Sequence, residues 1–307
     1  MILCVSLNPC LEINVEVDSL AVGKMHKVRS RRTFFTGSAM NVATGLSRLG
    51  AGALISGFMY EDNGRLYEQE LHREGVTYKF VWNKGRVKEV YKFIDDHSML
   101  TEVVDDATPI DPENSKSLIK LIAELSKGCE AVVFSGDLSA GLTEDYMVDV
   151  LSVIPEEVLK VVDTDGNRLI KMCRHGIDLV KPNIQELSRA TGMKITDRDS
   201  MVRACEMLLD NGAERVLLSL GKQGAMMFDG ARKLYCTSLN VAMNSTAGAG
   251  DAMVAAATKA LCEGADSYEI LRRGVAAGTA SVTLPDSISF LREKYEEILQ
   301  TVTVKEI

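Results

Sequence analysis

The chain has 307 residues, of which 46% are apolar, so it is long enough for one large α/β domain with a substantial core. Its 35 Lys and Arg residues are outnumbered by 43 Asp and Glu residues, and the formal net charge is −8. We expect no binding to the phosphate backbone of a nucleic acid or to an anionic membrane surface, because both attract basic proteins. Local groups of basic residues therefore have to be interpreted individually.

The chain shows no sign of secretion or membrane insertion. Its seven cysteines are scattered without a Cys-x-x-Cys pair, which is typical of neither a disulfide framework nor a zinc site. We interpret them as reduced thiols of a cytoplasmic protein. Residues 1–5 are apolar but have no basic leader, and Asn8-Pro9 ends the run, so a buried strand is predicted and not a signal peptide. No apolar run approaches 18 residues, and no membrane span is predicted.

Two early portions of the chain have the pattern of a sheet with one solvated face. Residues 11–17 alternate strictly between apolar and polar side chains, and residues 26–35 are extended and rich in charge. Strand patterning returns at residues 77–82, 87–95 and 99–103. We therefore predict that segments 11–34 and 76–103 form a small β-sheet lid, separate from a core built from segments 1–10, 35–75 and 104–307.

The rest of the chain alternates between helices and short apolar strands. After a first strand at residues 2–7, a helix is predicted from Thr36, then a strand at 53–58 and a helix at 62–74. The alternation predicts a mostly parallel sheet with helices on both faces, in three α/β/α layers, whose ligands bind at the carboxyl ends of the strands. The later strands are expected at 131–134, 159–163, 179–181 and 215–220, followed by a hairpin at 224–235 and three helices starting at Asp251, Ser267 and Ser289.

A glycine-rich segment, Asn-Ser-Thr-Ala-Gly-Ala-Gly-Asp at residues 244–251, precedes an Ala-rich stretch with high helical propensity. Gly248 and Gly250 leave backbone N–H groups unshielded, and a helix start adds free donors and the positive end of its dipole. Such a site suits a phosphate or a developing oxyanion. Asp251, in the first turn, could accept a proton from a hydroxyl that attacks a γ-phosphate. By itself, the segment leaves open an ordinary turn with Asp as a helix cap.

This segment resembles the C-terminal signature of the PfkB (ribokinase-like) family of sugar and nucleoside kinases, whose pattern is close to D-T-x-G-A-G-D. Ser245 stands at the first position, as is usual in the 1-phosphofructokinase and tagatose-6-phosphate kinase branch. The resemblance implies a ribokinase-like fold, ATP and Mg²⁺ as cofactors, an anion hole made by Gly248, Ala249 and Gly250, and Asp251 as the catalytic base.

Two further segments match the nucleotide half of this family. In Lys181-Pro182-Asn183-x-x-Glu186, the last two named residues lie on one face of a helix start, where the family positions Mg²⁺ and its waters. A plain helix N-terminus is the alternative. Residues 219–224, Ser-Leu-Gly-Lys-Gln-Gly, look like the family's nucleotide turn. The resemblance implies ATP contacts at Asn183, Ser219, Gly221, Lys222, Gly224, Thr246, Gly248, Gly250, Ala277, Gly278 and Ser281.

The acceptor half departs from the family pattern. Residues 7–12 are similar to the N-P-A-x-D start, but Glu12 replaces the sugar-binding Asp. Residues 36–41 keep two positions of G-G-K-G-x-N, yet Ser38 replaces the lysine that meets the substrate's phosphate. In residues 135–141, Asp137 replaces a phosphate-binding serine. The resemblance implies substrate contacts at Glu12, Gly37, Ser38, Asn41, Lys88, Lys92, Asp137 and Asp251, with Lys27 contributed across a homodimer.

These replacements change the charge expected around the acceptor. A phosphate group carries about −1.5 to −2 charge. Unit charges about 4 Å apart interact by roughly 4 kcal/mol at an effective dielectric constant of 20. An ionised Asp137 would therefore offset much of the attraction from Lys27 and Lys88. We expect an acceptor without the usual terminal phosphate, or one whose phosphate is held differently; the alternative is that Lys88 and Lys92 suffice.

The favoured function is an ATP- and Mg²⁺-dependent kinase that phosphorylates a hydroxyl of a small carbohydrate, with the lid excluding water and pairing two subunits. A non-catalytic nucleotide-binding or regulatory protein of the same fold is the alternative, motivated by the altered sugar site. A NAD-dependent dehydrogenase is not expected, because Asn8-Pro9 stands where the glycine fingerprint would follow the first strand.

Overall fold

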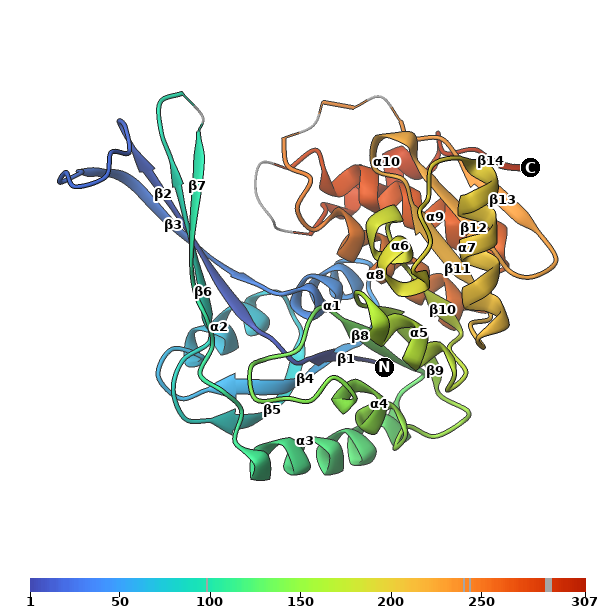
Figure 1. Ribbon diagram of the computed structural model, residues 1–307, viewed down its shortest axis with the longest axis horizontal. Helices are drawn as coiled ribbons and strands as arrows, with labels where there is room; N and C mark the ends of the chain where they lie inside the picture. Colours follow the sequence, from blue (N-terminus) through green and yellow to red (C-terminus); the bar gives the residue numbers. More distant parts are fainter. Residues whose placement is uncertain (98, 240, 243, 285–288) are drawn as a thin grey trace.

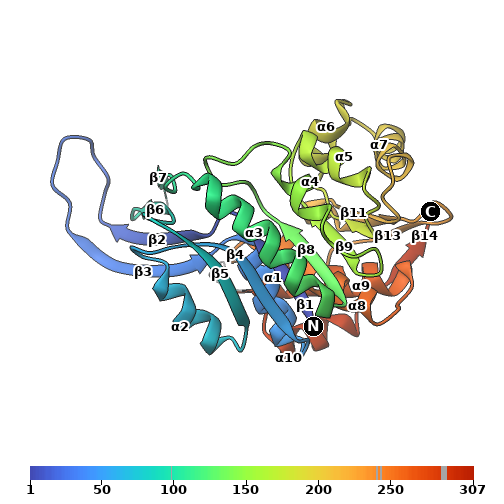
Figure 2. The same ribbon diagram turned by 90° about the horizontal axis from the view of Figure 1, so that it is seen from below.

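The computed structural model describes residues 1–97, 99–239, 241–242, 244–284 and 289–307. These residues form a ten-stranded sheet covered by helices on both faces, together with a four-stranded sheet that projects from it (Figures 1 and 2). In spatial order the strands of the large sheet are β14 (Val304–Glu306), β13 (Lys233–Cys236), β12 (Ala225–Phe228), β11 (Val216–Ser219), β10 (Leu179–Val180), β9 (Leu159–Asp163), β8 (Ala131–Ser135), β1 (Ile2–Ser6), β4 (Ala53–Tyr60) and β5 (Thr77–Asn83).

The large sheet is parallel from β5 to β11, and the last three strands are added antiparallel at one edge. β1, at its centre, is buried on both faces: Leu3 and Val5 point into one apolar layer, Ile2 and Cys4 into the other. Burial on both faces explains why this strand is continuously apolar in the sequence. The predicted three-layer α/β/α class is confirmed.

The helices divide between the two faces. One layer contains α1 (Ser38–Arg48), α8 (Ala249–Cys262), α9 (Ser267–Ser281) and α10 (Arg292–Leu299). The other contains α3 (Pro112–Leu125), α4 (Tyr146–Leu151), α5 (Asn167–Cys173), α6 (Ile184–Thr191) and α7 (Arg198–Asp210), while α2 (Arg65–Arg73) packs beside β5. In the described part of the chain no helix combines the length and apolarity needed to cross a bilayer.

The small sheet has the order β3 (Val28–Thr36), β2 (Cys10–Val17), β6 (Lys88–Ile94) and β7 (Leu100–Asp105). β2 and β6 are parallel and the outer pairs are antiparallel. Apolar residues of β2, beginning with Ile13, form a small core of their own with Tyr91 and Phe93. Figure 1 shows the sheet extending away from the core. Cys10, Thr36 and Lys88 are paired at one end of it, where the carbonyls of Cys10 and Thr36 accept hydrogen bonds from Tyr67 in α2.

One strand is not where the sequence analysis placed it. Residues 77–82 were predicted in the lid, but β5 pairs in parallel with β4 at the edge of the large sheet. An edge strand has a neighbour on one side only, and the first residues of β5 are exposed. Its mixed pattern therefore resembles that of a solvated sheet. β14 was not predicted, and α10 begins at Arg292, later than expected.

Candidate active site

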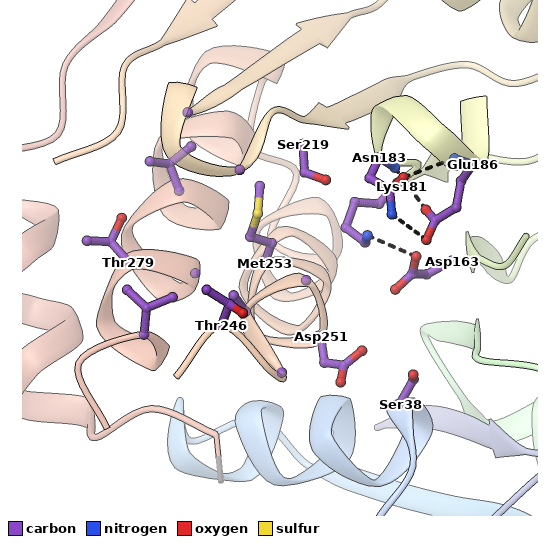
Figure 3. Close-up of a pocket in the computed structure, with 18 of the residues that line it drawn as sticks. Ser38, Asp163, Lys181, Asn183, Glu186, Ser219, Thr246, Asp251, Met253 and Thr279 are labelled. Carbon is purple, nitrogen blue, oxygen red and sulfur yellow. Dashed lines mark hydrogen bonds and ion pairs between the residues drawn. The ribbon is translucent and has the colours of Figure 1, made fainter. Parts of the chain in front are cut away.

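A cleft of about 840 Å³ lies along the carboxyl ends of β8 to β11 and against the first turn of α8. Its volume is within the usual range for small-molecule and cofactor sites. Figure 3 shows side chains from the strand ends on one side and from α8 and α9 on the other. Among the residues implied to contact ATP, this cleft is lined by Asn183, Ser219, Gly221, Lys222, Gly224, Thr246, Gly248, Gly250 and Gly278.

Two residues implied to contact ATP lie elsewhere. Ala277 and Ser281 are buried inside the α8–α9 layer, with 0% and 1% of their surface exposed, and do not line the cleft. The face of α9 that does line it carries Val275, Gly278, Thr279 and Val282. The sequence shows a run of small residues but not which helix face meets a ligand. That choice is made by how α9 packs on α8.

Gly248 ends the loop before α8 with a φ of 79°, a left-handed conformation that favours glycine. The Ala252 N–H makes the first bond to the Gly248 carbonyl, at 2.9 Å. The three preceding amides, from Ala249 to Asp251, have no acceptor inside the helix. They lie at the positive end of the helix dipole and at the wall of the cleft, which is a favourable place for a phosphate.

Asp251 is positioned by residues from the other end of the chain. Its Oδ2 accepts a hydrogen bond from Asn41 Nδ2 at 2.7 Å, and Ser38 also hydrogen-bonds to it. In Figure 3 the side chains of Asp251 and Ser38 lie close together at the cleft. Burial and the charge of Asp163 raise the pKa of Asp251 to about 7, against the influence of Asn41 and Lys181. A carboxylate with this pKa is suited to act as a general base near neutral pH.

A buried ion pair beside these groups was missed by the sequence analysis. Lys181 Nζ lies 3.0 Å from Asp163 Oδ1, and only 5% and 11% of the two side chains are exposed. Burial lowers the pKa of Lys181, but the carboxylates of Asp163, Glu186 and Asp251 outweigh it, so the pKa is raised and the ammonium stays charged. A Cβ on Gly250 would lie 3.2 Å from Nζ, which places this charge beside the free amides of α8. The only sequence signal was a polar residue at each of two strand ends.

Asn183 and Glu186 form a capping box at the start of α6. Asn183 Oδ1 accepts from the Glu186 N–H at 2.9 Å, and Glu186 Oε2 accepts from the Asn183 N–H at 2.8 Å. Both line the cleft, so the helix cap and the cleft wall are the same residues. Burial raises the pKa of Glu186, although Lys181 and the Asn183 amide oppose it. Each carboxylate oxygen has a second lone pair, so Glu186 can still bind a water or a metal ion.

A second pocket of about 180 Å³ lies at the base of the small sheet. Of the predicted acceptor residues, Gly37, Ser38, Lys88 and Asp137 line it. Ser38 and Asp137 also line the larger cleft, so the two spaces meet beside Asp251. We call this smaller space the acceptor pocket.

Strand β6 of the small sheet is fixed on both sides of Lys88. The Val87 N–H donates to Asn63 Oδ1 at 2.9 Å, and Asn63 Nδ2 donates to Glu89 Oε1 at 2.8 Å. Arg86 adds a contact of 3.1 Å to the same buried carboxylate. Because successive side chains of a strand point to opposite faces, this anchoring of Glu89 directs Lys88 to the acceptor pocket.

The remaining acceptor candidates do not line this pocket. Lys92 Nζ lies 2.7 Å from Glu12 Oε2 and 3.7 Å from Glu102, so these residues are paired with one another within the small sheet. Lys27 precedes β3, nine residues before Thr36 at the pocket end of the strand. At about 3.4 Å per residue the separation is about 30 Å, beyond the reach of a lysine in the same subunit.

The two spaces share Ser38, and Ser38 hydrogen-bonds to Asp251, which lines the larger space at the start of α8. This arrangement suits transfer of a phosphoryl group between two bound molecules. The fold and site thus define an α/β phosphotransferase. The chain belongs to the pfkB family of carbohydrate kinases, whose profile matches residues 3–294. It is therefore an enzyme that transfers a phosphoryl group to a sugar hydroxyl.

Similarity to named relatives extends over the whole chain. It is 25% identical over 312 residues to a tagatose-6-phosphate kinase of Staphylococcus epidermidis, covering 100% of both chains. It is 26% identical to a 1-phosphofructokinase of Borreliella burgdorferi, covering 100% of this chain and 99% of the relative. The structure of phosphofructokinase-2 from Escherichia coli with potassium superposes with a TM-score of 0.91 at 25% identity, over 98% of each chain.

Proposed function

We propose that this enzyme uses ATP and Mg²⁺ to phosphorylate a hydroxyl of a small sugar or sugar phosphate, with an acceptor site altered at Glu12, Ser38 and Asp137. The observation that carries the proposal is the position of Asp251, which lines the nucleotide cleft and hydrogen-bonds to Ser38, a residue that lines both the cleft and the acceptor pocket. Membership of the pfkB family supports it.

On the donor side, the chain offers an electropositive surface for the ATP phosphates. The amides at the start of α8 and the ammonium of Lys181 lie together, and Lys222 lines the same cleft. Glu186, with Asn183 beside it, would hold Mg²⁺ through water; the bound ion would neutralise charge on the phosphates. Magnesium commonly takes only one or two protein carboxylates in addition to water and phosphate oxygens, which suits this set of donors.

On the acceptor side, Asp251 takes the proton of the hydroxyl as its oxygen forms a bond to the γ-phosphorus. The bond from that phosphorus to the bridging oxygen breaks, and ADP leaves. Asn41 and Ser38 hold the carboxylate in orientation, and the α8 amides stabilise charge on the group in transfer. Closure of the small sheet over the pocket would exclude water, which would otherwise accept the phosphoryl group.

The test is ATP consumption across free and phosphorylated ketohexoses, aldohexoses, pentoses and nucleosides. We expect turnover with at least one member and none above background with Asp251→Asn. ATP binding by the wild type without consumption in any mixture would instead support the alternative, a non-catalytic nucleotide-binding or regulatory protein.

The pH dependence of the reaction should reveal the raised pKa of Asp251. A base must be ionised, so a pKa of about 7 predicts that kcat/KM falls as the pH drops through about 7, whereas an ordinary aspartate would sustain activity to about pH 4. Asn41→Ala removes a hydrogen bond that favours the ionised form. It should raise the pKa of Asp251 further and move this limb of the profile to higher pH. A profile flat from pH 5 to 8 for both proteins would contradict the assignment.

We also propose a cytoplasmic homodimer that pairs through the small sheet, in which Lys27 reaches the acceptor pocket of the partner subunit. Every residue of β7 is exposed, and Val103 and Val104 each expose 51% of their surface. Light scattering should give the mass of two chains for the wild type. The double variant Val103→Glu, Val104→Glu should have the mass of one chain. A wild type that stays monomeric at high concentration would rule this out.

The seven free cysteines agree with a reducing compartment.

A further inference from the structure

The wall shared by the two spaces carries a carboxylate. Asp137 lines both the cleft and the acceptor pocket, two residues after β8. The turn is tied to the neighbouring strand end, because the Gly136 N–H donates to the Asp163 carbonyl at 2.9 Å. Asp137 Oδ1 lies 2.7 Å from a terminal nitrogen of Arg168, in α5. The turn is thus fixed by the Gly136 backbone, and the carboxylate is held by Arg168.

Arg168 does not make this wall electropositive. Its other terminal nitrogen lies 3.4 Å from Glu144, so one guanidinium faces two carboxylates. Arg168 exposes 17% of its side chain, whereas Asp137 exposes 66%. Asp137 Oδ2 forms no hydrogen bond with any residue that the structure describes. This oxygen remains able to accept one from a ligand.

The residues described around the acceptor pocket carry no net formal charge. Among the described residues that line it, Lys88 and Asp137 are the charged ones. Lys88 forms no ion pair with any other described residue, and Lys92 is already paired with Glu12. The other polar groups are neutral and include Ser6, Asn8, Ser38 and Ser135. A phosphate of about −1.5 to −2 charge would find one cation and one anion there, whereas sugar hydroxyls can both donate and accept.

We propose that Asp137, positioned by Arg168, makes this enzyme select an unphosphorylated sugar or polyol, one hydroxyl of which donates to the free oxygen of Asp137. The inference depends on the kinase activity proposed above and specifies the acceptor class of the same site.

The test compares kcat/KM for free sugars and polyols with that for their monophosphates, in the wild type and in Asp137→Asn. The wild type should favour the free acceptors. Asp137→Asn should raise kcat/KM for a monophosphate by about tenfold, as expected for removing a unit charge about 4 Å from a phosphate in a well-solvated site. It should lower kcat/KM for the free acceptor by about tenfold, because a hydrogen bond to a charged group is lost.

Glu144→Gln is the matched control. It removes an equal charge from the same arginine but lies outside both spaces, so the acceptor preference should stay that of the wild type. A wild type that favours monophosphates, or an Asp137→Asn preference no different from that of Glu144→Gln, would overturn the inference and leave the kinase assignment intact. If neither the free acceptors nor the monophosphates support ATP turnover, both the inference and the kinase assignment are overturned. Because Asp137 is exposed, loss of folding is not expected, and thermal unfolding checks this.

Discussion

Replacing Asp251 with Asn is expected to lower kcat by about 10²- to 10⁴-fold while ATP binding is retained. The side chain keeps its shape and can still hydrogen-bond to Asn41, but it can no longer take the hydroxyl proton. The loss should appear mainly in kcat, since the ATP contacts come from other residues of the cleft. Single-turnover phosphoryl transfer measures it directly.

Thermal unfolding distinguishes loss of the catalytic base from misfolding of the Asp251→Asn variant. The raised pKa of Asp251 means that folding disfavours the ionised carboxylate, so the native state loses stability as the pH rises from about 4 through about 7. A neutral Asn does not incur this cost. The variant should therefore unfold at the same or a higher temperature than the wild type at pH 8. A variant that keeps wild-type kcat would remove Asp251 from the role of base.

Lys181→Met is expected to have the second large effect, on both stability and activity. Removing one partner of a buried pair strands the other charge, and such changes cost about 3–5 kcal/mol. Here the stranded group is Asp163, whose side chain is 11% exposed. The charge beside the α8 amides is lost as well, so kcat/KM for ATP should fall. Chemical denaturation and steady-state kinetics measure the two effects.

Two controls separate the effects. Lys222→Met removes an exposed cation from the same cleft and should leave stability within about 0.5 kcal/mol of the wild type. The double variant Lys181→Met, Asp163→Leu removes both buried charges, so it should recover much of the lost stability but not the activity. Full recovery of kcat/KM in the double variant would show that Lys181 acts only through stability.

Local patterns predicted the parts of this protein that depend on neighbouring residues. Period-two alternation predicted β2, an extended and charge-rich pattern predicted β3, and regular helix–strand alternation predicted the three layers. The glycine–aspartate segment predicted a helix start bordered by free amides, which is the form that it takes at Gly248. These features follow from backbone geometry within a few residues, so they can be read from the chain. Packing between elements decides which sheet contains β5 and which face of α9 lines the cleft. For these two features the sequence patterns led to a wrong prediction.

Only the tertiary structure decided how the charges pair. Asn41 reaches Asp251 across 210 positions of the chain, Lys181 meets Asp163, and Lys92 is engaged by Glu12. Asp137, which the resemblance implies to contact the acceptor, is held by Arg168. The type of each residue determines its charge. Its partner and its burial depend on which strand ends the fold brings together. The composition determined that the chain is acidic; the fold determined which cations and carboxylates line the cleft.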